Sequence, residues 1–175
     1  MTSHARIGGR RLLAESVPVL WVIATFFMLW KGVCVITDSP HPLLVVSSGS
    51  MEPAFRRGDL IVLWNRQQQI RAGDIPVVWF PGHPLPMVHR AIKVSQQLPN
   101  DNGISRQLIL TKGDNNEQDD TPLYPAGRSF VYREEIVGLV RGYVPCVGLA
   151  SLALKSSPWI LYVAIGALLA AGLRS

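Results

Sequence analysis

The stretch LLVVSSGSMEPAFRRGDLIVLW (43–64) contains two short apolar runs separated by a segment rich in serine, glycine and proline. Short aliphatic runs bounded by turn-forming residues are typical of β-strands. Residues 43–46 and 59–64 are therefore predicted strands. The small residues between them predict a turn that exposes a side chain beside a sheet edge.

Runs of the same kind continue toward the C-terminus, separated by turn signals such as Gly73-Asp74. Pro76 opens one of them, which is compatible with a first strand position or an edge strand. The polar residues from Ser95 to Arg106 predict a loop. A small, mainly β domain follows from this alternation, with further strands at PVVWF (76–80), MVHRAIKV (87–94), QLILT (107–111) and EIVGLV (135–140).

The apolar segment VPVLWVIATFFMLWKGVCVI (17–36) precedes this domain. As a helix it spans about 30 Å, the thickness of a bilayer's hydrocarbon core. Arg6, Arg10 and Arg11 lie before it and no basic residue follows closely, so the positive-inside rule places the N-terminus in the cytosol. Lys31 lies near the other end, where its side chain can reach the interface or a partner subunit.

A cleaved secretory signal peptide is the alternative, since it also has basic residues before an apolar core. This segment is longer than the usual core of about 7 to 15 residues, and it ends in VITDSPH without a small-residue cleavage site. An uncleaved signal anchor is therefore expected. The predicted organisation is a cytosolic N-terminus (1–15), a transmembrane helix (16–36), a lumenal peptidase domain (37–156) and a C-terminal apolar helix (157–175).

The C-terminal stretch WILYVAIGALLAAGL (159–173) is apolar but only fifteen residues long. As a helix it extends about 22 Å, which is short for a full span. A buried helix, a re-entrant helix and a span through a thinned bilayer all remain open. A short membrane-associated helix is expected.

The 175 residues carry a net charge of +5, and the basic residues are scattered. This pattern argues against nucleic acid as a partner and favours anionic lipid headgroups. The four histidines lack the spacing of a metal site, and Cys34 and Cys146 belong to no CxxC pair. Neither a metal nor another cofactor is expected.

Two residues are candidates for nucleophilic chemistry. Ser50 follows a predicted strand in VVSSGSMEP (45–53), where Gly49 lets a substrate backbone come close. His89 lies in PMVHRAI (86–92). A neutral imidazole accepts a serine proton near neutral pH, whereas a lysine amine does so only when burial lowers its pKa. Alone, each residue is more often an ordinary turn serine or a packed strand histidine.

The acidic segment LTKGDNNEQDDT (110–121) supplies the third element. A carboxylate bonded to one ring nitrogen of a histidine fixes the tautomer and stabilises the imidazolium. Asp114, Asp119 and Asp120 are all candidates for this role. A calcium-type loop or a solvated turn is the alternative, although the EF-hand spacing is absent.

Three motifs follow the apolar segment: SGSMEPAFRRGDL (48–60), VHRAIK (88–93) and LTKGDNNEQDD (110–120). In this order they resemble the catalytic subunit of the eukaryotic signal peptidase complex, a type I signal peptidase. The resemblance covers about residues 30–145. It implies a single-pass type II protein of the endoplasmic reticulum membrane with a lumenal β domain. It implies a serine endopeptidase that removes signal peptides from preproteins, with signal peptides, other subunits and the lipid bilayer as partners.

Carried over by position, the resemblance implies that Ser50 is the nucleophile, His89 the general base and Asp120 the third catalytic residue. Asp114 and Asp119 remain the alternatives for the third role.

The resemblance also implies an oxyanion hole formed by the hydroxyl of Ser48 and the backbone N–H of Ser50. Bacterial relatives use a lysine base where this chain has His89. Lys93 and Lys112 lie at other positions, and each would need strong desolvation to act as a base.

Two other classes of protein share some of these features. A non-catalytic, membrane-tethered scaffold would keep the fold without the chemistry, but all three catalytic positions hold competent residues. A self-cleaving repressor-type peptidase would need a DNA-binding domain, for which the N-terminal membrane segment leaves no space.

Overall fold

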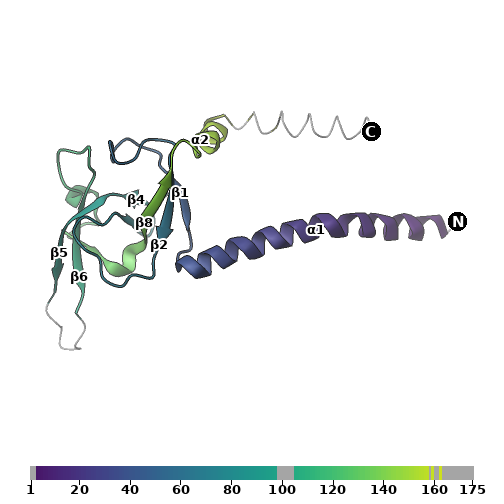
Figure 1. Cartoon of the computed structure of the whole chain (residues 1–175), viewed down its shortest axis with the longest axis horizontal. Helices are drawn as coiled ribbons and strands as arrows, with labels where there is room; N and C mark the ends of the chain where they lie inside the picture. The colour runs from purple at the N-terminus through teal and green to yellow at the C-terminus, as the bar shows by residue number, and fades with distance from the viewer. Residues whose placement is uncertain (1–2, 98–104, 158, 160–161, 163–175) are drawn as a thin grey trace.

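The computed structural model describes residues 3–97, 105–157, 159 and 162, in which a long N-terminal helix projects from a small β domain (Figure 1). Helix α1 spans Ser3–Thr37. Its part Ser16–Thr37, with 22 residues, is long and apolar enough to cross a membrane, and its apolar window contains no buried residue. The helix begins well before the predicted apolar segment because residues 3–15 are rich in alanine, leucine and arginine, which favour a helix.

The β domain consists of two antiparallel sheets. The larger has the strand order β1-β2-β8-β3-β4, and the smaller has the order β5-β6-β7. The strands are β1 (Leu43–Val45), β2 (Leu60–Trp64), β3 (Pro76–Val78), β4 (Met87–Val88), β5 (Arg90–Gln96), β6 (Gln107–Lys112), β7 (Val131–Tyr132) and β8 (Ile136–Val144), with short 3-10 helices η1 (Thr121–Leu123) and η2 (Arg133–Glu135) between them.

The mainly β fold class is confirmed, with four local differences. β8 ends at Val144, four residues beyond the predicted strand 135–140. The predicted strand 87–94 is broken at His89, which lies between β4 and β5. β7 was not predicted, because a two-residue strand carries too little pattern to be recognised. β5 continues through Gln96, so the predicted loop 95–106 begins later, and most of it lies outside the described residues. Pro76 is the first residue of β3, as expected.

The hydrophobic core divides at β3 into two clusters. Neighbouring strand residues point to opposite faces, and Val77 and Val78 accordingly belong to different clusters. The cluster that contains Val77 includes Met51, so the turn bearing Ser50 is packed against the larger sheet. The cluster that contains Val78 includes Tyr124, which lies near the acidic segment.

Helix α2 (Leu149–Ser156) follows the last strand and packs beside the start of the larger sheet. Gly58 has a φ of +97°, and a Cβ there would lie 2.3 Å from Cδ2 of Leu149. A Cβ on Gly148 would lie 2.4 Å from Cγ1 of Val45 in β1. Both glycines therefore allow the close approach of α2. The predicted C-terminal helix (157–175) lies outside the described residues, apart from positions 157, 159 and 162.

Candidate active site

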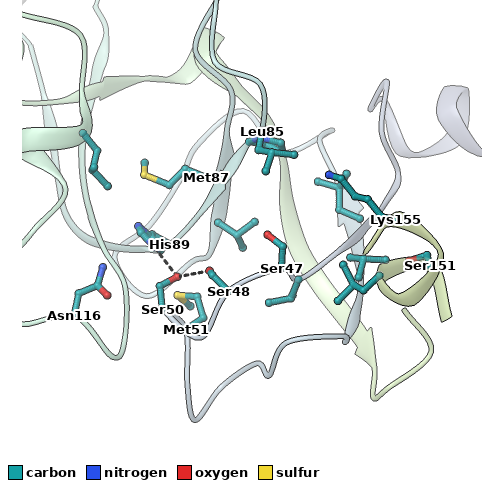
Figure 2. Close-up of a pocket in the computed structure, with 17 residues that line it drawn as sticks. Ser47, Ser48, Ser50, Met51, Leu85, Met87, His89, Asn116, Ser151 and Lys155 are labelled. Carbon is teal, nitrogen blue, oxygen red and sulfur yellow. Dashed lines mark hydrogen bonds between the residues drawn. The ribbon is translucent and has the colours of Figure 1, made fainter. Parts of the chain in front are cut away.

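A continuous chain of hydrogen bonds joins three residues from different parts of the fold. Ser50 Oγ lies 2.9 Å from His89 Nε2, and His89 Nδ1 lies 2.7 Å from Asp120 Oδ2. Figure 2 shows the Ser50–His89 bond at the wall of a pocket. Ser50 lies in the turn after β1, His89 at the break between β4 and β5, and Asp120 at the start of η1. The structure thus brings together the three residues that the resemblance implied.

Asp120 is held in a polar network that the sequence did not reveal. Its side chain is only 1% exposed, and Oδ2 also accepts a hydrogen bond of 2.6 Å from the hydroxyl of Thr111. The single hydroxyl proton of Thr111 is used in that bond, so Tyr124 donates to Thr111 Oγ1 at 2.9 Å. Burial raises the pKa of Tyr124, which keeps this donor protonated. Thr111 and Tyr124 therefore position the carboxylate that faces His89.

The same reasoning fixes the proton positions at the Ser50 end of this chain of hydrogen bonds. An ionised Asp120 is only an acceptor, so Nδ1 of His89 carries the proton and Nε2 is free to accept one from Ser50. Ser48 Oγ lies 3.2 Å from Ser50 Oγ. Since the proton of Ser50 is directed to His89, Ser48 is the donor in this pair.

The other two candidate aspartates have different contacts. Asp114 forms a two-pronged ion pair with Arg90, at 2.8 and 2.6 Å, and this contact raises the pKa of Arg90. From the sequence, Asp114 was an alternative to Asp120 for orienting His89. The ion pair instead links the acidic segment to the residue that follows His89. Asp119 is exposed, and hydrogen bonds from the side chain and from the backbone N–H of Thr121 lower the pKa of Asp119.

The acidic segment also supports the turn that carries the nucleophile. The backbone N–H of Asn115 donates to the carbonyl of Ser50 at 2.9 Å, and its side chain donates to the carbonyl of Gly49 at 3.2 Å. A Cβ on Gly113 would lie 2.7 Å from the Ser50 carbonyl oxygen, so only glycine fits there. Neither residue was identified from the sequence, where both read as ordinary turn residues.

A cleft of about 570 Å³ contains Ser50 and His89. Residues 44–48, 50 and 51 form one wall and residues 85–89 the facing wall. Ser151 and Lys155 of α2 lie at the end away from His89 (Figure 2). Lys93 and Lys112 do not line this cleft. An adjoining hollow of about 150 Å³ is lined by Val78, Phe80, His83, Leu85, Met87 and Leu123.

A small two-sheet β domain with a serine hydroxyl bonded to a buried histidine–aspartate pair defines a serine peptidase. The family described as Peptidase S24-like matches residues 22–112. The signal peptidase complex catalytic subunit sec11 of Pyrenophora tritici-repentis is 44% identical, covering 95% of this chain and 94% of the relative. The proteins of the same name from Aspergillus clavatus and Sclerotinia sclerotiorum are 44% and 43% identical, covering 90% of this chain and 88% and 89% of the relatives. The chain belongs to the S24-like peptidases and, among them, to the catalytic subunits of signal peptidase complexes.

Proposed function

We propose that this chain removes signal peptides from preproteins at the endoplasmic reticulum, with Ser50 as nucleophile, His89 as general base and Asp120 as the residue that orients the base. The observation that supports these roles most strongly is the unbroken hydrogen-bond chain from Ser50 Oγ through both ring nitrogens of His89 to Asp120. The family, described as Peptidase S24-like, and the relatives, named as catalytic subunits of the signal peptidase complex, support the reaction.

The reaction follows the usual course of acyl transfer. Ser50 Oγ attacks the scissile carbonyl while Nε2 of His89 takes its proton, and Asp120 stabilises the imidazolium that forms. His89 then delivers this proton to the leaving amine, and water hydrolyses the acyl-enzyme in a second cycle. The hydroxyl of Ser48 is close enough to turn from Ser50 toward the developing oxyanion, together with the backbone N–H of Ser50.

The substrate is proposed to bind as an extended chain between the two edges of the larger sheet. β1 and β4 are its edge strands, and both line the cleft that contains Ser50. An extended peptide placed between them can form main-chain hydrogen bonds with a free edge. The walls are largely aliphatic, and the adjoining hollow of about 150 Å³ is lined mainly by apolar side chains. These features suit apolar side chains of the substrate.

The relatives are named as subunits of a complex. We therefore propose that this chain acts with other subunits and that α1 anchors it in the endoplasmic reticulum membrane. The decisive test uses the full chain in liposomes with its co-purifying partners and a preprotein as substrate. A product that begins at the mature N-terminus is the expected result. An intact preprotein, with a control peptidase cutting the same material, would contradict the function.

The proposed topology places the N-terminus in the cytosol and Ser50 in the lumen. It predicts that Ile104→Thr, which creates the sequon Asn102-Gly-Thr, leads to glycosylation in microsomes, because this loop would then be lumenal. The natural sequence contains no such sequon. A mobility shift that endoglycosidase reverses is the readout, and Ile104→Thr combined with Asn102→Gln is the matched control. A variant that inserts into the membrane but stays unglycosylated would show the opposite orientation.

A further inference from the structure

The lumen-proximal end of α1 is bound by a segment of the β domain. Arg66, two residues after β2, donates from Nε to the carbonyl of Ile36 at 2.6 Å and from Nη2 to that of Val35 at 2.8 Å. The backbone N–H of Asn65 donates to the carbonyl of Thr37 at 2.8 Å. The last carbonyls of a helix have no partner within the helix, and a cation there also interacts favourably with the helix dipole. The domain thus provides the C-terminal cap of α1.

The capping segment is itself fixed to the rest of the domain. Arg133 of η2 donates through Nη2 to the carbonyl and the side-chain oxygen of Asn65, both at 2.9 Å, and burial lowers the pKa of Arg133. On the other side of the junction, Ser39 is 2% exposed and donates to the carbonyl of Val137 in β8 at 2.7 Å. The end of α1 is therefore connected to β2, η2 and β8.

This junction determines how the cleft is oriented relative to the anchor. Only residues 38–42 separate α1 from β1, and β1 forms part of the cleft wall. A five-residue connection alone would let the domain swivel on its anchor. The charge-assisted hydrogen bonds of Arg66, together with the buried hydrogen bond of Ser39, prevent this rotation of the domain. Figure 1 shows α1 leaving the domain as one continuous helix.

We propose that Arg66 is a positioning residue that locks the membrane anchor to the peptidase sheet and so sets the height of Ser50 above the bilayer. Because the apolar segment of a signal peptide lies in the same bilayer, a fixed height selects which peptide bond is cut. This inference rests on the proposed function and anchoring. It assigns no chemical step to Arg66.

The test uses the reconstituted complex and a preprotein with two identical cleavage sites at different distances from its apolar segment. Arg66→Gln is expected to lower the preference between the two sites by about tenfold, because it removes the charge from both hydrogen bonds to the end of α1. The site preference of Arg66→Lys should lie between those of the unchanged chain and Arg66→Gln. An ammonium keeps the charge but not the planar, two-pronged geometry of a guanidinium. Turnover of a short soluble peptide that lacks the apolar segment should stay within about twofold, because the cleft itself is intact. Arg71→Gln, at an exposed arginine in the same connection, is the matched control.

A second measurement does not depend on activity. Spin labels at the exposed Cys146 and at Leu20→Cys, in a Cys34→Ser background, report the distance between the domain and the anchor. A narrow distance distribution that broadens in Arg66→Gln is expected even if the function proposed above is wrong. An unchanged distribution, or an unchanged site preference in an active complex, would overturn the inference. Equal losses on both substrates with a lower unfolding temperature would also overturn it, because Arg66 would then only stabilise the fold.

Discussion

Ser50→Ala is expected to abolish preprotein processing, with a fall in turnover of about 10⁶-fold by comparison with other serine peptidases. The substitution removes one heavy atom, the hydroxyl oxygen of Ser50. Its hydrogen bonds go to His89 and Ser48 and not to the core. The fold should therefore be unaffected. Cleavage of a model preprotein by the reconstituted complex is the measurement, with thermal unfolding measured on the same preparations.

The matched control is Ser95→Ala, which also removes a serine hydroxyl, but from β5 and away from the cleft. It should process the preprotein at the rate of the unchanged chain. A fluorophosphonate probe gives an independent readout, since it should label the unchanged chain and Ser95→Ala but not Ser50→Ala. Processing at the normal rate by a folded Ser50→Ala complex would exclude Ser50 as the nucleophile.

The strands were predictable because their patterns are local. Short aliphatic runs bounded by turn signals predicted β1, β2, β3 and β6 to within one or two residues of their observed ends. The order of the strands was not predictable, because β8 lies between β2 and β3 through contacts distant in sequence. The break at His89 also has no local signal, since the residues on both sides have strand-like patterns.

The candidate site was predictable in part. Ser50 and His89 were candidates because one lies in a turn of small residues and the other on a predicted strand. The choice among the three aspartates came from the resemblance alone. Burial separates them in the structure, since Asp120 is 1% exposed whereas Asp119 faces solvent. The supporting residues, such as Thr111 and Asn115, have common side chains whose role depends on contacts that only the folded chain brings about.

The expected effect of Asp120→Asn is a loss of about 10⁴-fold in turnover with little loss of stability. One oxygen of Asp120 accepts from both His89 and Thr111. An asparagine therefore presents either its amide oxygen, which keeps the tautomer of His89 but lacks the charge, or its NH₂ group, which reverses the tautomer. His89 is only 6% exposed, so water compensates poorly for the missing charge on the imidazolium. Both orientations lower turnover.

The other two aspartates provide matched controls with the same chemical change. Asp119→Asn should leave turnover within about twofold, because the carboxylate of Asp119 is exposed and its hydrogen bonds go to Thr121 and not to the imidazole. Asp114→Asn should lower stability and turnover together, because it breaks the ion pair with Arg90 that links the acidic segment to the start of β5. Turnover and thermal unfolding of the three variants separate these roles. Full activity in Asp120→Asn, beside a folded but inactive Asp114→Asn, would move the orienting role to Asp114.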